Sequence, residues 1–123
     1  MSSHVSAPRT IAAGLKKQWS PRVIAEVGDT YIKVAKLEGS LVWHAHPNED
    51  ELFYVLKGSL RIEMESETVT LDEGQMFVVG KGVKHNPVAD EECLVLFIEP
   101  KSLEHTGDVL TNRTRTIEEQ LRD

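Results

Sequence analysis

Four side chains in the middle of the chain have the types and spacing of a metal site: His44, His46, Glu51 and His85. In a β-strand, residues i and i+2 point to the same side, so the imidazoles of His44 and His46 can converge on one point. Glu51 follows a short polar connection, and His85 follows a glycine-containing loop. Imidazole suits Zn, Cu, Fe and Ni, and a carboxylate adds Mn. The set therefore predicts a divalent transition-metal site whose metal identity stays open.

Four protein ligands on an octahedral metal leave two neighbouring coordination positions open. Those positions could take water, a bidentate substrate, or substrate plus dioxygen. The remaining histidines, His4 and His105, are expected to be surface or satisfied core residues. Cys93 is expected to be a small buried hydrophobe. No other nucleophile or proton-transfer group stands out, so catalytic residues beyond the ligands are unknown from the sequence.

The segments that must position these ligands indicate an all-β domain. Short alternating or apolar runs recur between turn residues. They lie at 22–27, 31–37, 41–45, 52–56, 61–65, 68–71, 76–79 and 94–99. Many short strands at regular spacing are typical of a sandwich or barrel.

Helices are expected only near the two ends of the chain. From Thr10 to Trp19 the pattern predicts a short helix that Thr10 caps and whose face carries Ile11 and Leu15 together with Trp19. Thr116 begins a second short helix, because a glutamate three residues on completes a capping box.

Strand parity predicts a mostly apolar pocket around the metal. If Glu51 points inward, Phe53 does too, and if His44 points inward, so does Val42. Met76 is expected on the inner face of its own strand. Val42, Phe53 and Met76 are therefore the predicted lining residues. An apolar pocket with a few polar groups is the usual composition of a small-molecule site.

The ligand-bearing segments resemble the two sequence motifs of the cupin superfamily. Residues 39–58 contain a glycine, His-x-His, a glutamate and a second glycine at spacings close to the first motif. Residues 74–85 resemble the second motif, which ends on His85. The family usually has proline where Gly80 stands and asparagine where Ala89 stands.

The resemblance implies a double-stranded β-helix, a jelly-roll barrel with the metal inside. It carries the family's ligand roles to His44, His46, Glu51 and His85. The chain also looks like small single-domain bacterial-type cupins labelled mannose-6-phosphate isomerase-like, a label that often reflects the barrel alone. Cupins of this size commonly pair as homodimers, with strands contributed from the N-terminal region.

Bulk properties narrow the class of protein. The chain has 123 residues, a formal net charge of -6 and one cysteine. This length suits one domain: a flexible N-terminus at 1–9, a barrel with its helix at 10–104, and a tail with a short helix at 105–123. The acidic balance argues against nucleic-acid binding, and no apolar run is long enough to span a membrane. The single cysteine and the lack of a signal-like N-terminus favour the cytoplasm.

Two functions stay open from the sequence. The first is a metal-dependent enzyme, a dioxygenase or an isomerase or lyase, acting on a small organic molecule. The second is a non-catalytic module that binds or senses such a molecule. A metal-free structural barrel is disfavoured by the intact ligand set. Because one fold hosts many chemistries, fold alone does not decide between the first two.

Overall fold

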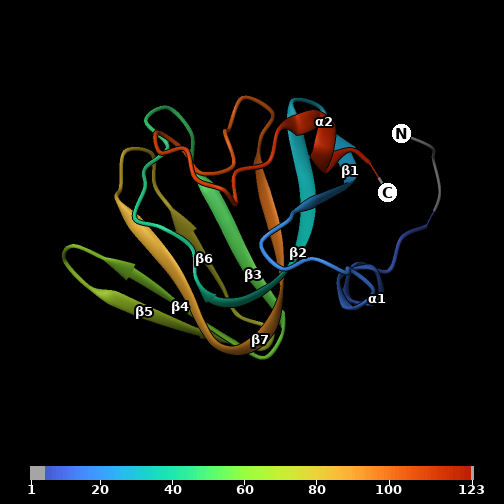
Figure 1. Ribbon diagram of the computed structural model, residues 1–123, viewed down its shortest axis with the longest axis horizontal. Coiled ribbons are helices and arrows are strands. Elements are labelled where there is room, and N and C mark those ends of the chain that lie inside the picture. Colours follow the sequence, from blue (N-terminus) through green and yellow to red (C-terminus); the bar gives the residue numbers. More distant parts are fainter. Residues whose placement is uncertain (1–4, 123) are drawn as a thin grey trace.

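The computed structural model describes residues 5–122, which form a β-barrel with a short helix near each end (Figure 1). The elements in chain order are α1 (Pro8–Ala13), β1 (Arg22–Val27), β2 (Thr30–Ser40), β3 (Glu51–Lys57), β4 (Ser59–Met64), β5 (Thr68–Asp72), β6 (Met76–Val79), β7 (His85–Pro100) and α2 (Ile117–Gln120). His4 and part of the expected flexible N-terminus lie outside the described residues. Among residues 5–122 we find no helix with the length and apolarity to cross a bilayer.

All the strands pair antiparallel, and β7 holds the barrel together. The main path of the sheet runs β1-β2-β7-β3-β6, and β4 pairs with both β5 and β7. β7 pairs with β2 along one edge; along the other it pairs first with β4 and then with β3. This double use of one 16-residue strand gives the double-stranded β-helix that the motifs predicted.

Two apolar clusters stabilise the barrel. The inward faces of the strands form the main core, which includes the fully buried Val55, Leu60, Ile62 and Val95. The second cluster lies outside the barrel, where α1 covers part of β2 and β7 and packs Ala12 there. Burying each such side chain contributes about 1.5–3 kcal/mol for the larger aliphatic residues. This core fixes the positions of β3 and β7, the strands that carry Glu51 and His85.

The predicted helix at 10–19 is shorter than expected. α1 ends at Ala13, and its N-cap is Ala7, with no side-chain cap, so the cap assigned to Thr10 is wrong. Trp19 adopts a positive φ of 57° and its indole N–H donates to the carbonyl of Glu38 at 2.7 Å. Trp19 therefore packs in the barrel core and does not share a helix face with Leu15. The C-terminal capping box is confirmed.

The parity predicted for 76–79 is also wrong. The register of β3 with β6 places Tyr54 opposite Met76 and Glu51 opposite Val79. Paired residues share a face of the sheet, so Met76 lies outside with Tyr54, and Val79 lies inside with Glu51. Met76 is accordingly 63% exposed, and Val79 is buried.

Candidate metal centre

The His-x-His segment is a loop rather than the strand predicted at 41–45. Only His44 forms a β-bridge, with the backbone of His85. The amide of each of these histidines donates to the carbonyl of the other, at 3.0 and 2.9 Å. The amide of Gly82 also donates to the carbonyl of His46 at 2.8 Å. Backbone hydrogen bonds thus join His44 to His85 and His46 to Gly82, although these pairs lie far apart in sequence. They fix the backbone positions from which the imidazoles extend.

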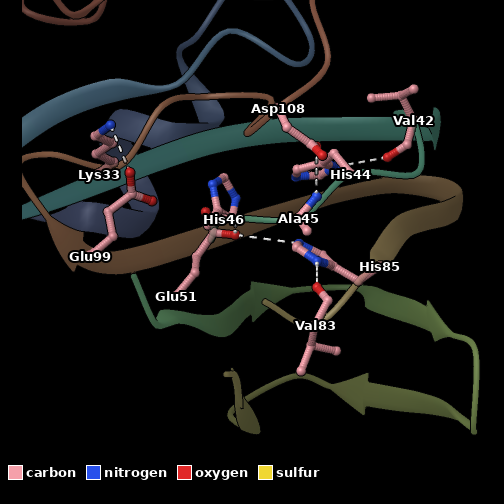
Figure 2. Close-up of polar contacts among 10 residues, drawn as sticks. All are labelled: Lys33, Val42, His44, Ala45, His46, Glu51, Val83, His85, Glu99 and Asp108. Atoms are coloured by element: carbon pink, nitrogen blue, oxygen red, sulfur yellow. Dashed lines mark hydrogen bonds and ion pairs between the residues drawn. The ribbon is translucent and has the colours of Figure 1, made fainter. Parts of the chain in front are cut away.

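The four predicted ligands come together in one buried cluster. Ligand atoms of His44, His46, Glu51 and His85 all lie within 4.8 Å of one another (Figure 2). Nε2 of His46 lies 3.4 Å from Oε1 of Glu51, and Nε2 of His85 lies 3.6 Å from the same oxygen. All four residues are buried. The arrangement confirms that these residues meet.

Two of the imidazoles have their tautomers fixed by backbone carbonyls. Nδ1 of His44 donates to the carbonyl of Val42 at 2.8 Å, and Nδ1 of His85 donates to the carbonyl of Val83 at 2.9 Å. A carbonyl oxygen only accepts, so each Nδ1 carries the proton and each Nε2 is left with its lone pair. Metal-binding histidines usually make this second hydrogen bond.

Several polar atoms at the centre of the cluster have no partner. Among the described residues, no hydrogen bond reaches either ring nitrogen of His46 or Nε2 of His85. Leaving a buried polar atom unsatisfied costs about 1–3 kcal/mol. Three imidazole nitrogens and a carboxylate oxygen facing one point are a donor set that a divalent transition metal would satisfy. The residues present therefore fit such an ion.

The protonation states also suit a metal. Burial lowers the pKa of His44 to about 4, aided by neighbouring His85. Burial alone would raise the pKa of Glu51, but the close imidazoles of His46 and His85 hold it well below its usual range. Metal binding needs neutral imidazoles and an ionised carboxylate. No protons then have to be expelled from His44 or Glu51 near neutral pH.

A buried ion pair that the sequence analysis missed lies beside the ligands. Nζ of Lys33 is 2.8 Å from Oε2 of Glu99, and each side chain is only 3% exposed (Figure 2). Burial and the nearby carboxylate of Glu51 raise the pKa of Glu99, against the opposing effect of Lys33. The alternation of the strands could have placed both residues on the inner face, because Lys33 shares its face with Ala35 and Glu99 shares its face with Phe97.

A small cavity adjoins the cluster. Its volume is about 30 Å³, enough for one or two water molecules. The lining residues are Trp19, Pro21, Lys33, Ala35, Leu37, Leu41, His44, Glu51, Phe53, Pro87, Phe97, Glu99 and His105. Phe53 is thus where parity placed it. Val42 does not border the cavity, although its carbonyl orients His44, and Met76 is on the outer surface.

The C-terminal segment, residues 101–121, follows β7 and passes across one end of the barrel (Figure 1). His105 belongs to this segment and lines the cavity. Its Nδ1 accepts a hydrogen bond from the amide of Arg115 at 3.0 Å. Burial lowers the pKa of His105 to about 4. The sequence offered no signal for this role, because the residue stands alone in a segment without strand periodicity.

The same C-terminal segment is fastened to the residue between the two loop histidines. The amide of Ala45 donates to Oδ1 of Asp108, and the amide of Asp108 donates to the carbonyl of Ala45, each at 3.2 Å (Figure 2). Gly107 lies so close that an added Cβ would stand 2.1 Å from the Ala45 oxygen. The segment therefore supports the His-x-His loop from above.

Cys93 takes no part in the site. Its thiol is fully buried, and burial raises its pKa to about 12. A thiol with so high a pKa carries almost no thiolate near neutral pH, and the thiolate is the reactive form. The expectation of a small buried hydrophobe is confirmed.

Comparison with known proteins agrees with the fold and the motifs. The Cupin domain model matches residues 30–99. A cupin-2 domain containing protein from Shewanella frigidimarina is 44% identical, with 78% of this chain and 94% of that chain covered and a TM-score of 0.75. Protein NMB1881 from Neisseria meningitidis is 26% identical over 79% of this chain and 99% of that one, with a TM-score of 0.72.

A curated relative extends the comparison beyond solved structures. The uncharacterized protein YdbB of Bacillus subtilis (strain 168) is 34% identical over 95 residues, which make up 76% of this chain and 84% of that protein. The family model spans more than half of the chain, and it includes His44, His46, Glu51 and His85. This chain therefore belongs to the cupin family.

Proposed function

We propose that this protein binds a divalent transition metal through His44, His46, Glu51 and His85 and uses it to act on a small organic molecule. The observation that carries the proposal is the fixed Nδ1–H of His44 and His85, which leaves both Nε2 lone pairs free in a cluster where the four residues bring ligand atoms within 4.8 Å of one another. A bound metal would supply Lewis-acid or redox chemistry at the cavity wall.

The cavity lining favours an enzyme over a passive binding module. From the sequence alone, no acid or base stood out beside the ligands, which would suit simple binding. Glu99 and His105 now border the same cavity as His44 and Glu51. Glu99 can accept or release a proton, and His105 can donate a hydrogen bond. Trp19, Phe53 and the other apolar lining residues leave room for little water around these groups.

Two assays distinguish the proposed enzymatic reactions. Protein loaded with Fe²⁺ should consume dioxygen with a member of a panel of diols, thiols and keto acids if the reaction is an oxygenation. Protein loaded with Mn²⁺ or Zn²⁺ should exchange hydrogen for deuterium in D₂O, seen by NMR, at carbon next to a carbonyl in sugars or keto acids if the reaction is an isomerisation or lyase step. His46→Ala is the matched control and should be inactive in both.

Failure of both assays, together with a ligand-dependent rise in thermal midpoint, would favour the non-catalytic binding cupin. If the protein binds no divalent transition metal, the proposed function is wrong. The metal identity, Zn, Fe, Mn, Ni or Cu, is decided by availability as well as by the ligands.

We also propose a homodimer, as the cupin resemblance implied. The support is an apolar outer sheet face formed by β6, β3 and β7, which α1 covers only in part, where Leu96 packs against the cluster that contains Ala12. Its residues are Leu52, Tyr54, Met76, Val78, Leu96 and Ile98. The cytoplasmic location and the division at residues 9 and 104 stay predictions from sequence.

A further inference from the structure

One polar group that faces the cavity is neither a metal ligand of the proposed site nor part of the Lys33–Glu99 ion pair. His105 lines the cavity together with His44 and Glu51. It comes from the C-terminal segment, so it approaches from outside the strands that carry the four ligands. From this position, His105 can contact a molecule that occupies the cavity.

The hydrogen bond to its other nitrogen decides what His105 can offer. The amide of Arg115 can only donate, so Nδ1 of His105 is an acceptor and lacks a proton. The neutral ring must then carry its proton on Nε2. Within residues 5–122 no hydrogen bond occupies that Nε2–H. His105 thus brings an unused donor to the cavity wall.

The backbone that fixes this tautomer is itself held from the barrel wall. Nε2 of Gln120 donates to the carbonyl of Arg115 at 2.9 Å, and Oε1 of Gln120 accepts from Nζ of Lys33. Gln120 is 3% exposed. The connection from Lys33 through Gln120 and Arg115 keeps the imidazole of His105 in place, so the donor is preorganised and costs little ordering on binding.

The charge of the proposed site indicates what the donor would meet. A divalent ion on three neutral imidazoles and one carboxylate leaves one net positive charge in a buried place, and such a charge favours an anionic partner. Lys33 is already paired with Glu99 and does not provide a second free cation. The rest of the lining is apolar and offers no partner for a second charge, and the cavity volume of about 30 Å³ admits only a small ligand.

We propose that His105 is a specificity-determining residue that donates from Nε2 to an oxygen of a small monoanionic carboxylate ligand. The ligand's carboxylate would meet the metal of the proposed site, and the small volume of the cavity, about 30 Å³, restricts the remainder of the ligand to very few atoms. This inference rests on the proposed metal-binding function. It adds the class of molecule and the residue that selects it.

The test uses glycolate as the probe and Co²⁺ as the metal, since Co²⁺ reports its ligands through visible absorption. Two variants separate the two nitrogens of the ring. His105→Asn keeps an oxygen that can accept from the Arg115 amide but loses the donor at the Nε2 position. His105→Gln keeps a donor at that position. Glycolamide, which has the same skeleton without the charge, is the control probe.

Glycolate should change the Co²⁺ spectrum of the wild type, whereas glycolamide should bind at least tenfold more weakly. Loss of one hydrogen bond to a charged acceptor, about 1.5 kcal/mol or more, should weaken glycolate binding roughly 10-fold in His105→Asn. His105→Gln should stay within about threefold of the wild type. Co²⁺ affinity should be unchanged in both variants, and the thermal midpoint should be unchanged in His105→Asn, which keeps the acceptor for the Arg115 amide.

Each contrary result has one meaning. If His105→Asn binds glycolate as tightly as the wild type, or if the Co²⁺-loaded wild type ignores glycolate, the role given to His105 is wrong. If His105→Asn loses Co²⁺ along with glycolate, His105 supports the structure and does not select the ligand. If the wild type takes up no Co²⁺, the metal-binding function itself fails.

Discussion

At the scale of single residues, the site depends on histidines held neutral. Besides burial, several charged or titratable groups act on His105. The nearby carboxylate of Glu51 raises its pKa, and Lys33, His44 and Arg115 lower it; burial dominates and brings the pKa to about 4 from 6.5. The unfolded chain therefore takes up a proton at higher pH than the folded protein does.

This difference predicts how the stability of metal-free protein changes with pH. The contribution of His105 is complete above pH 6.5 and is lost as the pH falls toward about 4, roughly 3 kcal/mol at most. Urea unfolding over this range should show a free energy of unfolding that falls more steeply for the wild type than for His105→Asn. Equal slopes for the two proteins would contradict the assigned burial of His105.

At the scale of elements, the C-terminal segment supports the His-x-His loop through a contact that needs glycine. Gly107 has a φ of 58° and lies against Ala45, whereas Gly28 has nearly the same φ, 57°, with nothing within 4 Å of an added Cβ. The two glycines therefore separate backbone strain from close packing.

Gly28→Ala should cost about 1 kcal/mol of the free energy of unfolding, from the left-handed backbone alone. Gly107→Ala should cost about 2–4 kcal/mol, because the backbone must also move away from Ala45. Only Gly107→Ala should weaken Co²⁺ binding, since Ala45 lies between two proposed ligands. Equal losses in urea unfolding, or an unchanged Co²⁺ affinity, would show that the segment does not support the loop.

Residue types and alternation predicted the turns and most strands. The ligands could be predicted because His44, His46 and Glu51 lie within one short stretch. The inner face of β6 could not be derived, because four apolar residues in a row carry no parity, and only the register with β3 decides it. His105 was missed because its approach depends on how a segment without periodicity crosses the barrel end.

At the scale of the whole molecule, the apolar outer sheet face predicts self-association. The register aligns Val78, Leu52 and Ile98 in one row across β6, β3 and β7, and Met76, Tyr54 and Leu96 in the next. Met76 and Val78 are 63% and 49% exposed. A face without charges can meet its own copy about a two-fold axis with no charge repulsion.

Val78→Asp should convert the proposed dimer to a monomer, because a carboxylate at this position would be buried without a partner. Val27→Asp is the control, since Val27 is 64% exposed but lies outside the face. Light scattering coupled to size exclusion gives the masses. A monomeric wild type, or a Val78→Asp protein that stays dimeric, would contradict this interface.

The central claim is that four side chains hold a divalent metal, and elemental analysis tests it most directly. Wild type, His46→Ala and His105→Asn are loaded with Zn²⁺ or Mn²⁺, dialysed, checked for folding by circular dichroism, and analysed for metal per chain. About one metal ion is expected in the wild type and in His105→Asn, and almost none in His46→Ala. A folded His46→Ala protein that retains as much metal as the wild type, or a wild type that retains none, would contradict the account.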